Sequence, residues 1–308
     1  MILQLRCKQI EFLTEPGNSD CEIIIFFGIF LCIFKGCNLR CKWCHNPELI
    51  SFHRELAYFP QKCIFCGRCV MVCPKVHIIE NNLVKLKREC CTACGKCADE
   101  CPANALELIG KEMSADEVFT EVLKDRHFFN ESGGGVTFSG GECLLQADFS
   151  ASLAERCKKE GIHTAVETSA FCLWSNIEKM LPFTDLFFTD LKIANSEKHR
   201  SYTSAGNELI IENIRRLSSK NKNIIIRIPV IPNVNDSAED FDALGEVIKT
   251  FDSGIHHIEL LKYNNLAKPK YDAISADYTD FAAFPQHEKQ MKAFAEKITD
   301  ITGVKCIF

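Results

Sequence analysis

The chain has 308 residues, of which 46% are hydrophobic and 25% charged. These proportions are ordinary for a soluble globular protein and allow one large or two ordinary domains. The net charge is -5, and Lys and Arg are scattered along the chain, which argues against nucleic-acid binding. The uncharged run at 23–34 is shorter than the roughly 20 residues that cross a bilayer. We therefore expect no nucleic-acid partner and no membrane span.

The unusual feature of the composition is its 19 cysteines. In a small secreted domain they would indicate disulfides, but this chain is long and its cysteines stand in Cys-x2-Cys rows, which favours metal binding in a reducing compartment. The N-terminus has Arg6 and Lys8 but no apolar stretch followed by small residues, so we expect no cleaved signal. The composition predicts a cytoplasmic, metal-binding protein.

The first element expected along the chain is a buried strand over residues 23–34. Residues 1–22 are mixed in character and end in the loop-like sequence TEPGNSDCE. The run at 23–34 is rich in β-branched and aromatic residues, which favours a strand. A loop that contains cysteines follows at its C-terminal end.

That loop, residues 35–47 with the sequence KGCNLRCKWCHNP, holds Cys37, Cys41 and Cys44 at Cys-x3-Cys-x2-Cys spacing. Thiolates are soft ligands that suit iron, and three of them leave a coordination position open, whereas a structural zinc site has four protein ligands. The open position indicates that a substrate or cofactor binds the metal. The alternatives are a surface zinc loop or three unrelated buried cysteines.

Residues 56–110 contain an internal repeat of the form Cys-x2-Cys-x2-Cys-x3-Cys-Pro. The first copy consists of Cys63, Cys66, Cys69, Cys73 and Pro74, and the second of Cys91, Cys94, Cys97, Cys101 and Pro102. This is the run of bacterial ferredoxins, in which the fourth cysteine ligates the other cluster. By that rule Cys101 joins the first three cysteines of the first copy, and Cys73 joins those of the second. A zinc ribbon is the alternative, and Cys90 could compete with Cys91, although the register favours Cys91.

After the repeat, helices and strands alternate. A capping box at Ser114–Glu117 opens a helix that we expect to end at about His127. Strands are expected at 135–139, 162–167, 185–192, 223–231, 255–263 and 304–308, and helices at 147–160, in a long segment ending near 219, at 236–251 and at 285–302. This alternation and the apolar strands predict a parallel sheet with covering helices.

The predicted fold class is α/β: a partial (open) TIM-type βα barrel with an inserted ferredoxin-like double-cluster domain. The βα run holds about six strands, fewer than the eight of a closed barrel. Three parts are expected. Residues 1–55 carry the N-terminal part of the barrel with the cysteine loop, residues 56–110 the insert, and residues 111–308 the remainder of the barrel.

Polar or glycine-rich segments follow the predicted strands, where parallel barrels carry their active-site loops. They are Gly140-Gly141-Glu142, Glu167-Thr168, Asp190-Leu191-Lys192 and Asn264. Glycines let backbone approach a ligand closely, Glu142 could accept from an ammonium group, and Lys192 suits a carboxylate. If isolated, the Gly-Gly pair would indicate only a turn, and Asp190 and Lys192 only a solvated strand face.

The cysteine loop, with Trp43 inside it and His45 after it, resembles the signature of radical S-adenosylmethionine (SAM) enzymes. Further stretches at 126–146, 158–170, 184–192 and 199–217 look like the activating enzymes of glycyl radical enzymes, a pyruvate formate-lyase activase-like family with members that carry a two-cluster ferredoxin insert. The resemblance covers most of the chain. It departs before the first strand, where the family has a sequence like DGPGIRT and this chain reads TEPGNSDCE.

The resemblance implies three 4Fe-4S clusters and SAM as cofactors. Cys37, Cys41 and Cys44 would hold the catalytic cluster, whose open iron binds the amino and carboxylate groups of SAM. The SAM-binding residues would be Trp43, His45, Gly140, Gly141, Glu142, Glu167, Thr168, Asp190, Leu191, Lys192 and Asn264. Glu167, Thr168 and Asp190 also match a monovalent cation site of the family.

The implied activity is the activation of a partner glycyl radical enzyme. One-electron reduction of the cluster cleaves SAM to methionine and a 5'-deoxyadenosyl radical, which abstracts hydrogen from a backbone glycine of the partner. A flavodoxin or ferredoxin-type reductant would supply the electron, and we expect a monomer. The insert clusters would relay electrons or serve as a docking platform. The alternatives are a radical SAM enzyme acting on a small molecule or other peptide, and an electron-transfer iron-sulfur protein.

Overall fold

The computed structural model describes residues 2–6, 28–81, 83–220, 222–252, 254–282 and 284–308. The segment TEPGNSDCE lies outside this part of the chain, as do the first residues of the strand expected at 23–34. The described part of that strand is β2 (Ile29–Phe34), which is parallel to its neighbour β8 (Gly135–Gly140).

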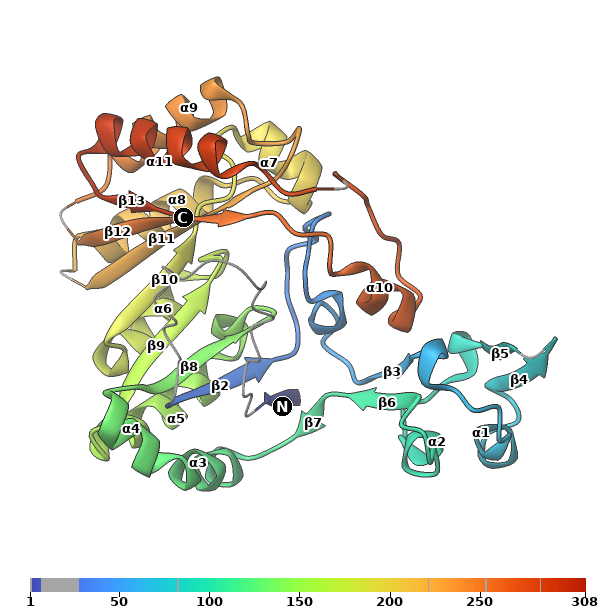
Figure 1. The fold of residues 1–308 in the computed structure, drawn as a ribbon. Helices are drawn as coiled ribbons and strands as arrows, with labels where there is room; N and C mark the ends of the chain where they lie inside the picture. The colour runs from blue at the N-terminus through green and yellow to red at the C-terminus, as the bar shows by residue number, and fades with distance from the viewer. Residues whose placement is uncertain (1, 7–27, 82, 221, 253, 283) are drawn as a thin grey trace.

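Among the described residues, one nine-stranded sheet forms the body of the protein, in the order β13-β12-β11-β10-β9-β8-β2-β1-β7 (Figure 1). Beyond β2 and β8, its parallel strands are β9 (His163–Thr168), β10 (Leu186–Asp190), β11 (Asn223–Val230), β12 (Ile255–Lys262) and β13 (Cys306–Ile307). Two antiparallel strands, β1 (Ile2–Arg6) and β7 (Lys111–Glu112), extend the sheet beyond β2. The prediction of an α/β fold with a parallel sheet is confirmed.

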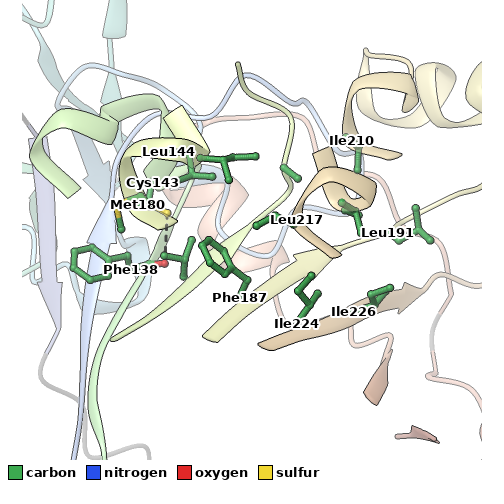
Figure 2. Packing of buried hydrophobic residues seen from close by; sticks show 14 of the residues in the cluster. Phe138, Cys143, Leu144, Met180, Phe187, Leu191, Ile210, Leu217, Ile224 and Ile226 are labelled. Carbon is green, nitrogen blue, oxygen red and sulfur yellow. Dashed lines mark hydrogen bonds between the residues drawn. The ribbon is translucent and has the colours of Figure 1, made fainter. Parts of the chain in front are cut away.

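Helices cover the outer side of this sheet (Figure 1). They are α3 (Ala115–Lys124), α4 (Arg126–Ser132), α5 (Ala147–Lys159), α6 (Trp174–Met180), α7 (Ser196–Thr203), α8 (Glu208–Ser218), α9 (Ala238–Ile248) and α11 (Glu288–Thr302). In the core, Phe138 and Phe187 from the strands pack with Met180 and Leu217 from the helices (Figure 2), and all four are fully buried. This packing brings the C-terminal ends of β2, β8, β9 and β10 to one edge of the sheet.

Several element predictions are confirmed and others need correction. Ser114 and Glu117 form the expected capping box, but the helix ends at Lys124, and α4 follows it, because Asp125 leaves the helical conformation. The long helical segment before 219 is two helices, since Ser204 adopts a left-handed conformation with φ of 70°. The sequence analysis did not predict β1, α6 or α10 (Lys268–Ile274).

The cysteine repeat forms a small unit that projects from the body (Figure 1). Its elements are β3 (Glu55–Tyr58), η2 (Pro60–Lys62), α1 (Arg68–Val72), β4 (His77–Glu80), β5 (Leu83–Leu86), η3 (Arg88–Cys90), α2 (Lys96–Asp99) and β6 (Leu106–Ile109). The antiparallel pair of β3 and β6 is the stalk of this unit, and β4 pairs with β5 farther out. Its first and last strands span Glu55 to Ile109, close to the predicted insert.

Candidate active site

The cysteine loop leaves the end of β2 and is tied by its backbone to distant segments. The Cys37 N–H donates to the carbonyl of Ile50 at 3.0 Å, and the Arg40 N–H donates to the carbonyl of Thr203, at the end of α7, at 2.8 Å. The turn inside the loop closes on itself, because the Cys44 N–H donates to the carbonyl of Cys41 at 3.0 Å. The three thiols are thus held by contacts that the tertiary structure supplies.

A cation faces the three thiols. Burial raises the pKa of Cys41 to about 12 and that of Cys44 to about 11, and the charge of Lys192 opposes this rise in both. Burial also raises the pKa of Cys37, and Lys192 again lowers it. Burial alone would disfavour the thiolate form of these cysteines. Because the ammonium group of Lys192 acts on all three sulfurs, it partly offsets this effect and favours thiolate ligands and an anionic metal group.

Trp43 lies on the inner side of the loop, in a buried aromatic cluster. Its ring centroid is 6.1 Å from that of Tyr202 and 6.2 Å from that of Phe281. Ile193 and Tyr263 belong to the same cluster. Trp43 therefore packs within this cluster and supports the loop, and its place beside the cofactor stays a prediction.

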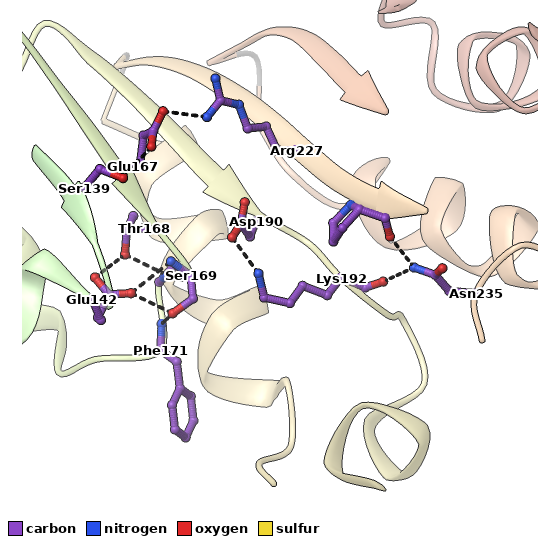
Figure 3. Close-up of polar contacts among 12 residues, drawn as sticks. Ser139, Glu142, Glu167, Thr168, Ser169, Phe171, Asp190, Lys192, Arg227 and Asn235 are labelled. Atoms are coloured by element: carbon purple, nitrogen blue, oxygen red, sulfur yellow. Dashed lines mark hydrogen bonds and ion pairs between the residues drawn. The ribbon is translucent and has the colours of Figure 1, made fainter. Parts of the chain in front are cut away.

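Lys192 pairs with Asp190 at the end of β10 (Figure 3), with Nζ 2.5 Å from a carboxylate oxygen. Burial alone would lower the pKa of Lys192, but the charges of Asp190 and Cys41 raise it above its ordinary value. Asn235 accepts from the Ile231 N–H and donates to the Lys192 carbonyl at 2.7 Å, which holds the segment after β10 in place. The pair belongs to the site and is not a solvated strand face.

Leu191 lies between these two charged residues but points elsewhere. Its side chain is fully buried in the main core, and its N–H donates to the carbonyl of Arg227. The backbone carbonyl is therefore the one polar group of Leu191 that remains for a ligand.

Glu142 is buried and fully engaged by protein donors. One carboxylate oxygen accepts from the Leu144 N–H and the Thr168 hydroxyl, and the other accepts from the N–H and the hydroxyl of Ser169 (Figure 3). Burial raises the pKa of Glu142, and these hydrogen bonds oppose that rise. With only 1% of its surface exposed, Glu142 positions the ends of β8 and β9. In the sequence analysis, we expected the Glu142 carboxylate to accept from an ammonium group of a ligand. In the structure, its four hydrogen bonds come from the protein.

The glycines before Glu142 are explained by the approach of protein backbone. A Cβ on Gly140, whose φ is +119°, would lie 2.2 Å from the carbonyl oxygen of Phe34, and one on Gly141 would lie 2.4 Å from that of Gly36. The Gly141 N–H donates to Phe34 and the Glu142 N–H to Gly36. The Gly-Gly turn therefore locks the start of the cysteine loop.

Glu167 belongs to a charged network that sequence analysis missed. Its carboxylate accepts from the Ser139 hydroxyl at 2.5 Å and from Arg227 at 2.7 Å (Figure 3), and Arg227 also binds Glu259 at 2.8 Å. The guanidinium lies 3.8 Å from the ring centroid of Phe188. Arg227 is the single charge inside the apolar run of β11, and a lone charge in a buried strand is the signal that could have found it.

The family's monovalent cation site is not assembled from the expected residues. Glu167 is held by Ser139 and Arg227, the Thr168 hydroxyl donates to Glu142, and Asp190 pairs with Lys192. In the described part of the chain, no three His, Cys, Asp or Glu side chains converge as ligands of a single ion. These residues as arranged do not fit a bound cation, and we derive no step through one.

His45 and Asn264 meet at the other side of the loop, where the Asn264 amide lies 3.5 Å from Nδ1 of His45. Burial lowers the pKa of His45, so its ring is neutral near pH 7. Next to it, α10 packs against the loop, with Lys270 3.1 Å from Glu48 and Tyr271 buried. Burial, together with the charges of Cys44 and Cys41, raises the pKa of Tyr271.

The eight cysteines of the projecting unit gather in two groups of four. One cavity is lined by Cys63, Cys66, Cys69 and Cys101, and a second by Cys73, Cys91, Cys94 and Cys97. These are the interleaved sets expected from the repeat. Tyr58 lines the first cavity and Leu56, nearer the start of β3, lines the second. We therefore name the first set the outer thiol group and the second the inner thiol group.

Backbone donors point at these sulfurs. The Ala93 N–H lies 3.4 Å from Sγ of Cys91, and the Ala105 N–H lies 3.3 Å from Sγ of Cys101. The pKa of Cys94 is lowered, mainly by the N–H of Lys96. Donors of this kind stabilise negative charge on sulfur, as a thiolate-bound metal group requires.

One arginine joins the projecting unit to the body. Arg88, three residues before Cys91, donates to the carbonyl of Leu56 at 2.5 Å, to the carbonyl of Ala273 at 2.7 Å and to the hydroxyl of Ser275 at 3.0 Å. Ala273 is the penultimate residue of α10, the helix that packs against the cysteine loop. Arg88, close in sequence to the inner thiol group, and the cysteine loop thus both contact α10.

A cleft of about 620 Å³ opens on the outer side of the cysteine loop, between the loop and α10. Arg40, Cys41 and Lys42 line one wall, and Tyr271 and Ile274 line the other. Among the helices in the described residues, none is long and apolar enough to cross a membrane.

The model of the radical SAM superfamily matches residues 31–244. The chain is 39% identical over 251 residues to the (2S)-3-sulfopropanediol dehydratase activating enzyme of Klebsiella oxytoca, with 79% of each chain covered. It is 36% identical over 270 residues to the trans-4-hydroxy-L-proline dehydratase activating enzyme of Clostridioides difficile, with 87% of each covered. The solved structure of TYW1 with a lysine-pyruvate adduct aligns with 92% of this chain, and the alignment covers 76% of the TYW1 chain. At 13% sequence identity and a TM-score of 0.54, this match shows a similar fold and nothing more.

Proposed function

The chain belongs to the radical SAM superfamily and, within it, to the activating enzymes of glycyl radical enzymes, and we propose that Cys37, Cys41 and Cys44 hold its catalytic cluster. The protein activates a partner enzyme by abstracting hydrogen from a backbone glycine, with methionine and 5'-deoxyadenosine as the products of SAM. The 4Fe-4S cluster supplies the electron that cleaves SAM reductively. The residues of this chain bind, orient and shield the reactants.

The loop fits a cluster better than a single metal ion. Its three thiols share the positive charge of Lys192, which suits an anionic cluster. In a 4Fe-4S cluster each thiolate binds a separate iron, so three thiols leave one iron open for SAM. The gathering of three thiols and one cation at the end of β2 is the observation that carries the proposal.

The neighbouring strand ends suit SAM, which carries ammonium, sulfonium and carboxylate groups. Asp190 and Glu167 are anionic, Lys192 and Arg227 are cationic, and the side chains of Asp190 and Glu167 are about one-third exposed. Opposite charges at one edge can orient a ligand that carries both signs. His45 and Asn264, which meet across the loop, close the other side of this seat.

The partner's glycine has to reach the same edge. The described sheet has free edges at β13 and β7, which supports a partial, open barrel rather than a closed one. An open barrel would admit a loop of the partner laterally while the remaining walls exclude water from the radical. The dehydratases named in the two relatives indicate the class of partner, a glycyl radical dehydratase or lyase.

The projecting unit is a ferredoxin-like insert with two further clusters in this proposal. Two cavities, each lined by the four thiols that the interleaved rule requires, support it. We assign the clusters a relay role, because Arg88 links the inner thiol group to α10 and α10 packs against the catalytic loop. The alternative role, a docking platform alone, would not require this connection.

The test is direct. The protein is reconstituted with iron and sulfide without oxygen and incubated with SAM, reductant and a candidate glycyl radical enzyme, and electron paramagnetic resonance is used to detect the glycyl radical doublet. A doublet together with 5'-deoxyadenosine is expected. Abundant deoxyadenosine without a radical on any competent partner would instead favour an enzyme that acts on a small molecule or another peptide.

Two further properties belong to this proposal. A flavodoxin or ferredoxin-type protein supplies the electrons in the cytoplasm, and the protein acts as a monomer. Sedimentation of the reconstituted chain, alone and with its partner, would reveal a dimer if one forms. A protein that only carries electrons would keep its redox activity after Cys41→Ala, which separates that alternative from the activating enzyme.

A further inference from the structure

The two copies of the cysteine repeat have similar backbones. Helices α1 and α2 both begin after a left-handed glycine, Gly67 with φ of 75° and Gly95 with φ of 86°. Two residues earlier, Phe65 and Ala93 also have positive φ, 54° and 50°. Each position of the first copy therefore has a counterpart in the second, and the second copy serves as an internal reference for the first.

The surfaces of the copies differ in polarity. Met71, Ile64 and Val72 expose 78%, 63% and 38% of their area. Their counterparts are the polar residues Asp99, Thr92 and Glu100. Because the backbone does not demand apolar side chains at these positions, their exposure in the first copy needs another reason. Contiguous exposed apolar groups usually mark a contact with another molecule, and Met71 and Val72 are neighbours in α1.

The two copies also differ in the charge of their side chains. Residues 60–75 contain three basic side chains and no acidic one, whereas residues 88–103 contain two basic and three acidic side chains. The basic residues of the first copy, Lys62, Arg68 and Lys75, are all exposed. Within the described residues none of them forms a salt bridge, and Lys62 lies over the Phe59 ring at 4.7 Å. The first copy thus exposes apolar and basic side chains where the second copy has polar and acidic ones.

Part of this surface lies beside the outer thiol group, while Val72 lines the cavity of the inner thiol group. Ile64, Phe65 and Arg68 line the same cavity as the four cysteines of the outer thiol group, and Cys66 itself is exposed. A molecule seated here would lie next to the group that is farthest from the catalytic loop along the stalk. That is where an electron would enter a relay.

We propose that the first-copy surface, defined by Lys62, Ile64, Arg68, Met71, Val72 and Lys75, docks an acidic protein that donates single electrons. The inference rests on the proposed function of the insert. In each encounter the carrier loses one electron and the outer cluster gains it. A small surface that combines apolar and basic side chains suits such short-lived complexes, since charge accelerates the encounter and a small contact area permits release.

The position of the surface favours an electron carrier over the glycyl radical enzyme as its occupant. The glycyl radical enzyme must bring its glycine to the sheet edge that holds Asp190, Lys192 and Glu167. The helix α1, which carries Arg68, Met71 and Val72, lies on the part of the insert away from the nine-stranded sheet, beyond α2 (Figure 1). A carrier docked there leaves the sheet edge free, so reduction and radical transfer need not compete for one surface.

The experiment uses the full chain reconstituted with iron and, as probe, a reduced flavodoxin of strongly negative charge. Stopped-flow absorbance gives the second-order rate constant for reduction at low and high salt. Replacing the three cations together, Lys62→Glu, Arg68→Glu and Lys75→Glu, should slow the reaction about 100-fold at low salt and remove most of its salt dependence. The double substitution Met71→Asp with Val72→Glu, which introduces the residue types of the second copy, should slow the reduction about 10-fold.

A matched control and a second reductant complete the design. Lys87→Glu reverses the same charge at an exposed residue of the insert that lies outside the first-copy surface, and it should leave the flavodoxin rate unchanged. Photoreduced 5-deazaflavin, which is small and needs no docking surface, should reduce all variants at the wild-type rate. Iron content equal to wild type shows that the variants have kept their clusters.

Three results would overturn the proposal. Equal flavodoxin rates in all variants would mean that the carrier docks elsewhere, for example at the cleft beside Cys41. An equal slowing with deazaflavin would mean that the variants damage the clusters. Loss of binding to the glycyl radical enzyme with intact flavodoxin rates would assign the surface to that partner. The proposed function is tested separately, since it fails if the wild-type protein reduced by deazaflavin makes no glycyl radical.

Discussion

The catalytic loop and the insert both collect cysteines, but they hold them by opposite means. The loop thiols depend on backbone contacts with residues far along the chain, such as Arg40 to Thr203. The insert thiols depend on a local repeat that brings its own glycine turns and its own N–H donors. A site built from distant parts can combine its thiols with charged residues such as Lys192, whereas a local repeat brings together mainly the residues of one short segment. The comparison predicts that the two regions can be disrupted independently.

The largest effect is expected from Cys41→Ala. Removing one of three loop thiolates should abolish 5'-deoxyadenosine formation while the insert keeps its clusters. Iron analysis should fall from about twelve to about eight atoms per chain, as the ligand count for three clusters requires. Cys90→Ala is the control, because Cys90 is an exposed thiol outside both groups. Iron falling to near zero in Cys41→Ala would show that the regions are not independent.

The second effect concerns the support of the loop. The Glu142 carboxylate accepts four hydrogen bonds, and in Glu142→Gln one of its oxygens becomes an NH2 group that faces other donors. This substitution should lower the free energy of unfolding by about 3 kcal/mol. Urea unfolding monitored by Trp fluorescence measures this. Glu178→Gln, at an exposed position of α6, should cost almost nothing. A small effect at Glu142 would mean that the carboxylate is not the anchor of the strand ends.

A smaller effect is expected at the joint between the two regions. Arg88→Ala removes three hydrogen bonds to Leu56, Ala273 and Ser275, and amide hydrogen exchange in β3 and α10 should become about 10-fold faster. Arg88→Lys should restore only part of the protection, because an ammonium group cannot span three acceptors. Arg68→Ala removes the same charge without touching the joint and serves as the control. Unchanged exchange would mean that the insert is held by its stalk alone.

The smallest expected effect is a pH dependence of the folding stability that arises from His199. Burial lowers the pKa of His199, whose Nδ1 lies 2.6 Å from the Ala205 carbonyl and 3.0 Å from the hydroxyl of Thr203. Because the unfolded chain binds a proton more readily than the folded one, this contribution to stability is present above pH 6.5 and is lost as the pH falls. Chemical unfolding between pH 7.5 and 5 should show it, and His199→Gln should flatten the profile.

The sequence by itself determined the α/β class, the interleaved cysteine groups and the loop motif. Each depends on spacing along the chain, and spacing limits which residues can meet. The cysteine repeat was predictable because its ligands come from one short segment with a period of its own. The family resemblance likewise rests on local motifs.

Only the tertiary structure decided what the residues around the motif do. It placed Glu142 and the two glycines in the support of the loop, Leu191 in the core and Arg227 beside Glu167, and it revealed Arg88 as the joint to the insert. These roles arise from contacts between residues far apart in the chain, where burial and the partner of a charge set its function. The order of residues along the chain shows neither the burial of a side chain nor its partner. The sequence could therefore identify the charged residues of the site but not the partner of each charge.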